Sequence, residues 1–590
     1  MSFLLAVLCL FLPPAWVYLL SLLFPARRDG GTEQQAKGNL AEIEGPVWER
    51  MSVFEHIERG LKMNPNEPAV ISTFQSANHL NDLVSQLDKR KCHSTLWQKD
   101  NGDSNYQNKG LKHGSGNHSQ QSSEHQNLVL WSSRQSPTRN VAKTSPTCLL
   151  LTYSQLHHTA TKLAFGLLAN GAQPNTTLLM LIPNGGEYAL LLWTCVLLRI
   201  TYVSLDPASL DISGFTALKH TLRMLKPQIV VAPDTLSGKA LDVAMSELLL
   251  PEPIRISLSK SQTHNWKTLV DIAADAGKCT VESEVLVAAA RKDNPDRIHS
   301  IMFTSGTSGL PKGCPLRVGG MSHVLQSQSW LVTPESGVVA LQQPHNSRGI
   351  APAQTLQTWK AGGAVVMTGQ QFNVLDALKA IRQFSATFIV LTPPMVHEIA
   401  AEMSINPLDI SSVKTIQVGG DAVTKGVLTK CSMLFPTANV CVNHGMTEGG
   451  GAFAWPFFST PVSSIPFFGE ICPIAAVAPG TTIRLWDTEK KCLVGKGELG
   501  ELHISSPSII KHYLGGRSED SFHDDRKGRW FKTGDIAMVN RNGIVYILGR
   551  KKDMIKRAGV AIMPAAIESS IEAFTGAQVR STLLLIFQCH

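Results

Sequence analysis

The sequence predicts an α/β protein built on parallel sheets, preceded by one N-terminal transmembrane helix. Short apolar runs such as LLMLIP (178–183), QIVVAP (228–233) and FIVLTP (388–393) have the length and composition of buried strands. Helical stretches separate these runs, and strand–helix alternation is typical of parallel sheets with helices on both faces. The third observation is an uncharged run over residues 3–24.

That N-terminal run is long enough to cross a bilayer. Its 22 residues span roughly 33 Å as a helix, against about 30 Å for the hydrocarbon core. Arg27 and Arg28 follow it, and the positive-inside rule keeps that flank cytosolic. We therefore expect residues 1–28 to form a single-pass anchor in the endoplasmic reticulum or another endomembrane. A signal peptide is the alternative, although no basic residue precedes the run. A buried core helix is disfavoured because the run is terminal and apolar throughout.

The composition excludes several classes of protein. Of the 590 residues, 43% are hydrophobic, so most of the chain can bury a core. The net charge of +8 is spread thinly, without the dense Lys/Arg block that nucleic-acid arms carry. The 11 cysteines form no CxxC pair, which disfavours a disulfide framework and a zinc ribbon.

The ordered body begins near residue 49 and contains one insertion. A polar linker (29–48) precedes Val53, Ile57 and Leu61, which recur at helical spacing. Between residues 101 and 140, Ser, Asn and Gln account for 19 of 40 residues. Such a composition cannot bury enough apolar surface to offset chain entropy, so residues 75–147 are predicted to be a disordered insertion. The large domain is expected to span residues 49–548.

The most informative segment is IMFTSGTSGLPKG, residues 301–313. A short apolar strand leads into a loop of hydroxyl and glycine residues, followed by a lysine. The glycines let the backbone approach an anion, and free N–H groups, hydroxyls and the lysine can surround phosphate oxygens. It is not a Walker A loop, because Lys312 precedes Gly313 and Cys314. The candidate phosphate-binding residues are Thr304, Ser305, Gly306, Thr307, Ser308, Gly309 and Lys312.

This loop resembles the phosphate-binding signature of the adenylate-forming (AMP-binding) superfamily, which includes acyl- and aryl-CoA synthetases, peptide-synthetase adenylation domains and luciferases. Further segments resemble the other motifs of that superfamily in the same order, over about residues 50–570. These are LTYSQL (151–156), LIPN (181–184), GGD (419–421), HGMTE (444–448), GELGELHISSPSIIKHYL (497–514), FKTGD (531–535) and GRKKDMIKRAG (549–559). The resemblance implies a large N-terminal domain of parallel sheets with packed helices, a β-rich subdomain, and the start of a small α+β C-terminal domain.

The same resemblance implies an ATP-dependent enzyme. A carboxylic acid, either fatty or aryl, would attack the α-phosphorus of ATP to give an acyl-adenylate and pyrophosphate. A thiol would then attack the acyl carbon and release AMP. The thiol is expected to be CoA in an acyl-CoA ligase, or the phosphopantetheine arm of a carrier protein in a stand-alone adenylation enzyme. In the anchored enzyme the catalytic domain would face the cytosol.

Residue roles follow from the matched motifs. Lys312 and the loop would hold the β- and γ-phosphates, Thr447 the α-phosphate and Glu448 a Mg²⁺ ion. These three residues are the candidate catalytic groups. The remaining assignments are His444, Gly445 and Gly420 to the nucleotide site, Asp535 to the ribose, Arg550 to the ribose or phosphate, Lys552 to the domain hinge, and His345 to the acyl pocket.

The end of the sequence departs from the superfamily pattern. Only 31 residues follow Gly559, and no lysine follows Lys556. We therefore expect residues 549–590 to be a truncated C-terminal lid that lacks a second catalytic lysine. Either the sequence is incomplete, or adenylation is impaired. In the second case the chain would be a catalytically impaired nucleotide-binding protein.

Overall fold

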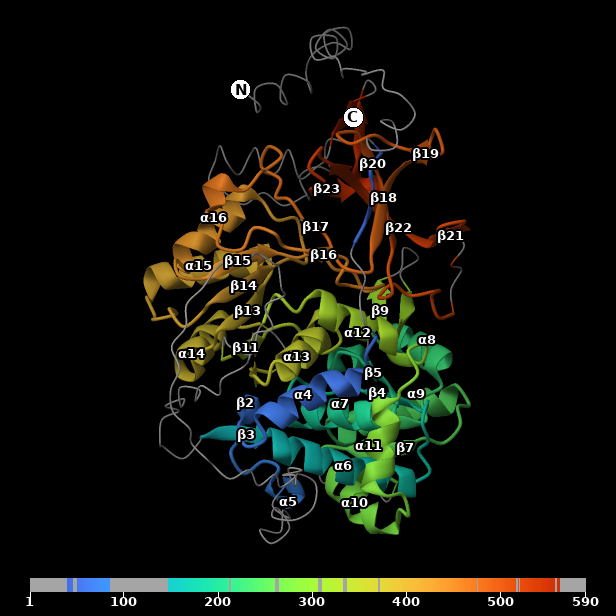
Figure 1. Ribbon diagram of the computed structural model, residues 1–590. Coiled ribbons are helices and arrows are strands. Elements are labelled where there is room, and N and C mark those ends of the chain that lie inside the picture. Colours follow the sequence, from blue (N-terminus) through green and yellow to red (C-terminus); the bar gives the residue numbers. More distant parts are fainter. Residues whose placement is uncertain are drawn as a thin grey trace, which may run out of the picture. The chain divides into compact units, whose positions relative to one another are not determined.

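The computed structural model divides the chain into two units, Met1–Val84 with Pro146–His590, and Ser85–Ser145. All the residues that it describes belong to the first unit (Figure 1). They are 40–45, 50–84, 147–211, 214–259, 265–305, 310–332, 337–369, 372–474, 476–515, 518, 520–557 and 560–562.

One seven-stranded sheet has the order β10-β9-β5-β4-β6-β7-β8 and is parallel except for the β9–β10 hairpin. Its strands are β4 (Thr177–Met180), β5 (Thr201–Ser204), β6 (Ile229–Ala232), β7 (Ile254–Ser257), β8 (Lys267–Thr268), β9 (Ile298–Ser305) and β10 (Pro311–Arg317). The helices of this part of the chain are α6 (Tyr153–Ala169), α7 (Gly186–Leu198), α8 (Phe215–Leu225), α9 (Thr235–Glu247), α10 (Leu269–Ala274), α11 (Ser283–Arg291) and α12 (Val318–Ser327).

A second seven-stranded sheet has the order β15-β14-β13-β11-β12-β2-β3 and is parallel except at β2–β3. Its strands are β2 (Pro68–Ser76), β3 (Cys148–Thr152), β11 (Val339–Gln342), β12 (Ala364–Met367), β13 (Phe388–Leu391), β14 (Thr415–Val418) and β15 (Asn439–Val442). Its helices are α4 (Val53–Met63), α13 (Ile350–Lys360), α14 (Val374–Phe384), α15 (Pro393–Ile405) and α16 (Lys425–Leu434). The predicted parallel sheets are confirmed.

The third sheet is antiparallel and supplies the β-rich part of the fold. Five of its strands have the order β1-β18-β20-β22-β21; in addition, β19 pairs with β18 and β23 pairs with β22. Its strands are β1 (Glu42–Glu44), β18 (Thr482–Asp487), β19 (Cys492–Leu493), β20 (Leu499–Ser505), β21 (Phe522–Asp525), β22 (Gly528–Val539) and β23 (Val545–Arg550). Two short pairs complete the described strands: β16 (Phe453–Ala454) with β17 (Ala476–Val477), and β24 (Ile555–Arg557) with β25 (Val560–Ile562).

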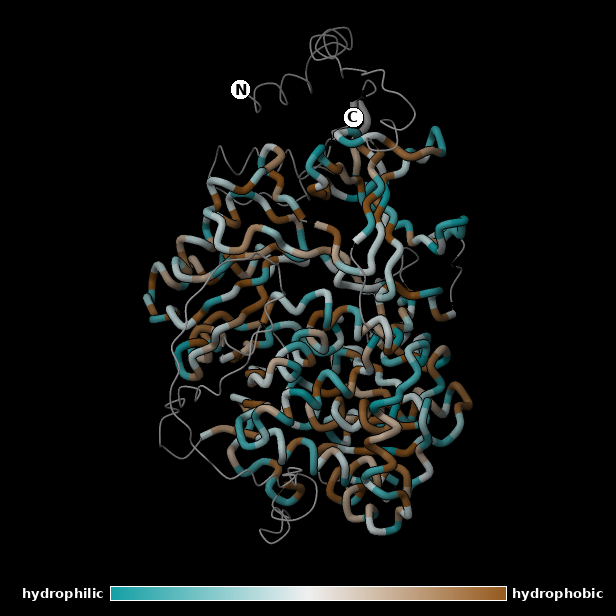
Figure 2. Tube along the Cα trace, viewed as in Figure 1, coloured by the Kyte–Doolittle hydropathy of each residue, from teal (hydrophilic) through white to brown (hydrophobic). Residues whose placement is uncertain are grey.

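One hydrophobic core joins the two parallel sheets. It combines buried residues of both sheets with residues of α4, α6, α7, α12 and α13. Figure 2 shows that hydrophobic residues recur along the whole trace of the described chain. The ring centroids of Trp193 and Trp359 lie 5.1 Å apart in this core. The buried Tyr153 hydroxyl donates a 2.7 Å hydrogen bond to the Gly363 carbonyl. Helix α7 is buried at every position, which its largely apolar sequence permits, and the carboxylate of Glu187 is hydrogen-bonded by Gln75 and His79.

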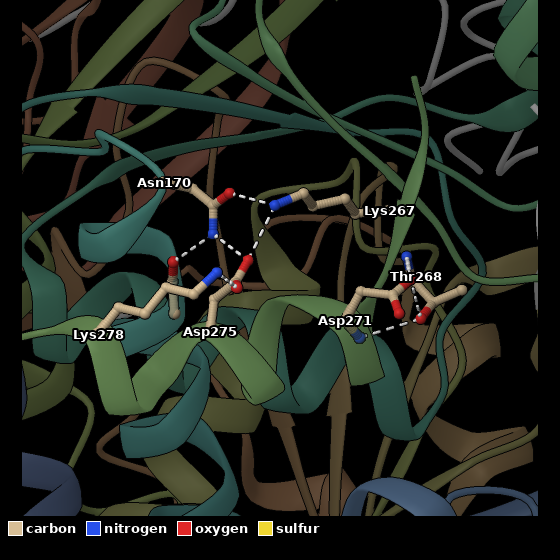
Figure 3. Close-up of polar contacts among 7 residues, drawn as sticks. Asn170, Lys267, Thr268, Asp271, Asp275 and Lys278 are labelled. Carbon is tan, nitrogen blue, oxygen red and sulfur yellow. Dashed lines mark hydrogen bonds and ion pairs between the residues drawn. The ribbon is translucent and has the colours of Figure 1, made fainter. Parts of the chain in front are cut away.

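Polar contacts fix the ends of these helices. Helix α10 begins with a capping box in which Thr268 and Asp271 each pair with the other's backbone N–H. Nearby, Asn170 at the end of α6 and Lys267 both bond the Asp275 carboxylate, at 3.0 and 2.8 Å (Figure 3). Lys278 donates a hydrogen bond to the other carboxylate oxygen of Asp275. The bonds from Lys267 and Lys278 hold the pKa of Asp275 well below its usual range. This cluster ties α6 to the α10 region.

The structure corrects the prediction of a transmembrane helix. Among the described residues, no helix is both long and apolar enough to cross a bilayer. The longest of them, α6, has 17 residues, or about 26 Å, and the strongly apolar α7 has 13 residues that are all buried in the core. Residues 3–24, on which the prediction rested, lie outside the described residues. The predicted anchor, and the single-pass membrane location derived from it, are therefore withdrawn.

The boundary of the predicted insertion also differs. Residues 75 and 76 end strand β2, and Asn81–Val84 form the short helix α5. Leu80, Leu83 and Val84 are buried in the core that joins the two parallel sheets, which explains why this stretch is ordered. Residues 85–146 of the predicted insertion lie outside the described residues, as does most of the predicted lid beyond Ile562.

Candidate active site

A cavity of about 360 Å³ lies where the second sheet meets α12 and α13. The carboxyl ends of β13, β14 and β15 supply Thr392, Gly419 and Asn443 to its wall. Ligands of parallel α/β sheets bind in such crevices beyond the carboxyl ends of the strands. This position makes the cavity the candidate substrate site.

The predicted phosphate loop connects β9 to β10. The two strands pair antiparallel with Thr304 opposite Lys312. These two side chains therefore lie on one face of the hairpin, at the end where the connecting loop begins. Ser305 ends β9, and its side chain is not described; Gly306, Thr307, Ser308 and Gly309 lie outside the described residues. The structure thus brings together Thr304 and Lys312 of the predicted set.

Glu448 and Lys312 are connected through a residue to which sequence analysis assigned no role. The Tyr513 hydroxyl donates a 2.5 Å hydrogen bond to Glu448 Oε1, and Lys312 Nζ lies 5.2 Å from the centre of the Tyr513 ring. Burial and the neighbouring Glu448 carboxylate raise the pKa of Tyr513, so the phenol remains a donor. Only its place in the motif at 497–514 signalled Tyr513 in the sequence.

Backbone hydrogen bonds hold the segment around Tyr513, residues 510–514, in place. The Ile510 N–H donates to the Glu448 carbonyl at 2.9 Å, and the Leu514 N–H donates to the Gly313 carbonyl at 2.8 Å. The 510–514 segment therefore holds the exit of the phosphate loop beside the Thr447–Glu448 motif. Thr447 itself lines the cavity.

The donor set fits a Mg²⁺ ion bound mainly through substrate. Among the described residues, no group of three or more His, Cys, Asp and Glu side chains is arranged to hold a metal ion. Mg²⁺ typically keeps several waters and binds through one or two carboxylates together with substrate phosphates. The single carboxylate of Glu448, oriented by Tyr513, suits that mode of binding.

A second polar group lies next to the cavity. Asp535 on β22 is opposite Arg550 on β23, with 3.2 Å between Asp535 Oδ1 and Arg550 Nε. The other oxygen of Asp535 lies 3.6 Å from His444 Nε2. Arg550 also donates to the Thr533 carbonyl, and Asp535 is only 6% exposed. His444, Asp535 and Arg550 are therefore brought together, although His444 lies about 90 positions before Asp535 in the sequence.

Gly420, predicted at the nucleotide site, and its neighbour Gly419 have steric reasons to be glycine. Gly420 has a φ of +85°, a conformation that L side chains rarely adopt, and it lines the cavity. A Cβ on Gly419 would lie 2.4 Å from the Asn443 carbonyl oxygen. Gly445 also lines the cavity, next to His444.

His345 and Lys552 lie outside the cavity wall and outside the two polar groups described above. His345 is buried, and its Nδ1 accepts the Ser347 backbone N–H at 3.2 Å, whereas Ser347 and Arg348 line the cavity. Burial lowers the pKa of His345. Lys552 is exposed in the short 3₁₀ turn Lys551–Asp553 that follows β23.

Much of the remaining wall comes from α12, α13 and the glycine run at 449–451. The apolar side chains of Met321, Val324 and Ala353 lie beside the buried amides of Gln354 and Gln357. The spacing of these residues in the sequence is ordinary for a helix. Nothing in it shows which helical face borders a cavity.

Comparison with known proteins identifies a matching family and several relatives. A family model described as AMP-binding enzyme matches residues 131–514. An acyl-CoA ligase from Pestalotiopsis microspora is 46% identical over 540 residues, covering 91% of this chain and 85% of the relative. A 4-coumarate–CoA ligase from Nicotiana tabacum is 23% identical over 438 residues, 71% of this chain and 74% of the relative.

A solved structure with a similar fold is that of the anthranilate CoA ligase AuaEII in complex with anthranoyl-AMP. Its TM-score is 0.61 at 15% identity, covering 90% of this chain and 83% of that chain. At this identity the likeness concerns the fold alone. The resemblance predicted from the motifs is confirmed by the family match and by the relative of 46% identity: the chain belongs to the AMP-binding enzyme family.

Proposed function

We propose that this chain is an AMP-forming acid–thiol ligase that uses ATP, Mg²⁺ and CoA. It activates a carboxylic acid as an acyl-adenylate and then transfers the acyl group to the thiol. Family membership and the 46% identity to an acyl-CoA ligase support both half-reactions. The observation that carries the assignment is the convergence of three distant motifs beside one cavity: Lys312, the Thr447–Glu448 pair, and Asp535 with His444.

The first half-reaction develops negative charge on phosphate oxygens. Lys312, aligned with Thr304 at the mouth of the β9–β10 hairpin, supplies a cation and a hydroxyl there. Thr447 offers a hydroxyl to the α-phosphate, where the acid attacks and pyrophosphate leaves. Glu448 would hold Mg²⁺, which when bound neutralises phosphate charge. Asp535 accepts hydrogen bonds from the ribose hydroxyls.

In the second half-reaction a thiolate attacks the acyl carbon, and AMP leaves with the bonding electron pair. We propose CoA as the acceptor because the relative of 46% identity is an acyl-CoA ligase. A carrier protein with a phosphopantetheine arm is the alternative acceptor. The two acceptors are distinguished by supplying free CoA alone.

The test uses the purified chain with ATP, Mg²⁺, CoA and a panel of fatty and aryl acids. Adenylate formation is read by acid-dependent ATP–pyrophosphate exchange, and acyl-CoA by mass spectrometry. Lys312→Ala is expected to lower exchange by about 100-fold, as the loss of a positioned charge does elsewhere. Lys379→Ala on the exposed face of α14 is the matched control.

Equal exchange by the two variants would refute the role of Lys312. Exchange without acyl-CoA would favour a carrier protein as acceptor. The absence of exchange with every acid, together with intact ATP binding, would indicate a nucleotide-binding protein rather than a ligase.

A further inference from the structure

Arg317 lies at the end of β10, the strand whose first two residues are Pro311 and Lys312. The pairing of β10 with β9 shifts register between Leu316 and Arg317, directly before α12 begins. The Arg317 side chain is only 17% exposed, and it is not among the residues that line the cavity. Any effect of Arg317 on the reaction must therefore act through other residues.

The guanidinium group of Arg317 joins three separate acceptors. Its Nη2 donates to the carbonyl of Pro507 at 2.9 Å and to the carbonyl of Ile509 at 3.3 Å. Its Nη1 donates to Asp296 Oδ1 at 3.1 Å, and Lys511 Nζ donates to the same oxygen at the same distance. A guanidinium presents several donors in a fixed plane, whereas the ammonium of a lysine is a compact point charge. A lysine at this position could not hold all three acceptors at once.

The contact with Ile509 is passed directly to the backbone of Glu448. The carbonyl of Ile509 and the N–H of Ile510 belong to one planar trans peptide group, so they point in opposite directions. The carbonyl accepts from Arg317, and the N–H donates to the Glu448 carbonyl at 2.9 Å. One rigid peptide group therefore connects the Arg317 side chain to the backbone of a candidate catalytic residue.

The turn at 446–449, which carries Glu448, also packs against this segment. The two ends of the turn exchange backbone hydrogen bonds of 3.2 and 3.1 Å. A Cβ on Gly449 would lie only 2.6 Å from the Ser508 carbonyl oxygen, so the turn and residue 508 are in tight contact. Arg317 holds the carbonyls on either side of Ser508 and thereby fixes the surface against which the turn packs.

Lys312 is tied to the same segment further along the chain. The Leu514 N–H donates at 2.8 Å to the carbonyl of Gly313, the residue that follows Lys312. A displacement of residues 507–510 relative to β10 would therefore change the separation of Lys312 and Glu448. These two charged groups are the ones expected to act on the phosphates of ATP.

We propose that Arg317 is a positioning residue for adenylation, and that it sets the position of Glu448 relative to Lys312 through the Ile509–Ile510 peptide group. Since this role concerns the use of ATP, it rests on the proposed ligase function. The half-reaction that consumes ATP should depend on Arg317 far more than the attack of a thiol on a supplied acyl-adenylate. The reason is that an acyl-adenylate carries no β- or γ-phosphate.

The test variant is Arg317→Lys, which keeps the positive charge but removes the planar set of donors. Two rates are measured with the purified chain: acid-dependent ATP–pyrophosphate exchange, and acyl-CoA formation from synthetic acyl-adenylate and CoA. The acid is the member of the panel that gives the fastest exchange in the wild type. Exchange is expected to fall by about tenfold or more, as a displaced reacting group predicts, and acyl-CoA formation to stay within about twofold of wild type.

Binding provides a readout that needs no acid. Calorimetry gives the Kd of ATP with Mg²⁺ and the Kd of AMP, for the wild type and for Arg317→Lys. The ratio of the first Kd to the second is expected to rise by about tenfold, because contacts of charged groups with the β- and γ-phosphates are weakened. A general loss of folded protein would leave this ratio unchanged.

Two further variants test the route. Arg255→Lys is the matched control, because Arg255 on β7 is also partly buried and bonds the carboxylates of Asp242 and Glu252. It should leave the ratio of the two rates unchanged whatever its effect on Tm. Arg317→Lys combined with Tyr513→Phe should reduce exchange by less than the product of the single effects, because both act on one support. A full product would contradict the shared route.

Equal losses of exchange and of acyl-CoA formation would show that Arg317 only stabilises the fold, and unchanged rates would show that it is dispensable. Either result overturns the proposal. Arg317→Gln provides a second variant if the lysine variant does not fold. If the wild type lacks one of the two activities, the ligase function fails at that step, and the ratio of the Kd values alone decides the role of Arg317.

Discussion

Replacing His299 should make the protein markedly less sensitive to acid. His299 lies on β9, is 1% exposed, and has no partner for Nε2. Its ring lies edge-on to Tyr202, with 5.1 Å between the ring centroids. Burial, and to a lesser extent Arg297, lowers the pKa of His299 from 6.5 to about 3. Between these values the unfolded chain binds a proton that the folded chain does not, so stability falls as pH drops below 6.5.

The magnitude follows from these two pKa values. Between pH 7 and pH 5, His299 alone should cost about 2 kcal/mol of the free energy of unfolding. His299→Leu, with a side chain of similar volume, should remove that part of the pH dependence. The assay is urea unfolding followed by tryptophan fluorescence at pH 7 and pH 5, with His512→Leu as the control for an exposed imidazole.

An equal loss of stability on acidification in wild type and His299→Leu would refute the argument. His299→Gln provides a second variant if the leucine does not fit. The same reasoning extends to His56 and His503, whose pKa values burial lowers to about 3, and to His157, whose pKa it lowers to about 4. Acidification to pH 5 should therefore destabilise the wild type by several times the contribution of His299.

Three further predictions follow from described contacts. Tyr513→Phe removes a hydrogen bond to Glu448 and should raise the Mg²⁺ concentration needed for ATP binding about tenfold. Calorimetry that shows the same Mg²⁺ dependence in the variant and in the wild type would contradict this prediction. Gly450→Leu should reduce kcat/KM for bulky acids more than for small ones, because a Cβ there meets no atom within 4 Å and would extend into the cavity; equal losses for both would argue against this. Tyr153→Phe removes the hydroxyl that donates to the Gly363 carbonyl at 2.7 Å. It should lower the free energy of unfolding, measured with a denaturant, by about 1–3 kcal/mol. An unchanged unfolding midpoint would show that this hydrogen bond does not stabilise the protein.

Local patterns in the sequence were sufficient for much of the fold. The apolar runs at 178–183, 228–233 and 388–393 contain residues of β4, β6 and β13. Such runs predict strands because a strand that is buried on both faces needs a continuous apolar sequence. Val53, Ile57 and Leu61, which recur at helical spacing, lie on the buried face of α4.

Contacts distant in sequence could not be predicted in the same way. Gln354 and Gln357 are placed by the packing of α13 against β11 and α12, which no local pattern reports. Tyr513 gains its role only when the chain returns to Glu448. The transmembrane prediction relied mainly on length and hydropathy, and the 13-residue α7 shows that a strongly apolar stretch also suits a helix enclosed by other elements.

The 510–514 segment has a consequence for how the sequence can vary. Within five residues it bonds the Glu448 carbonyl, the Glu448 side chain and the Gly313 carbonyl. Two motifs more than 130 positions apart thus share one short support, whose spacing must match both at once. Insertion or deletion of a single residue there would break at least one of these attachments, so this stretch should tolerate changes of residue type far better than changes of length.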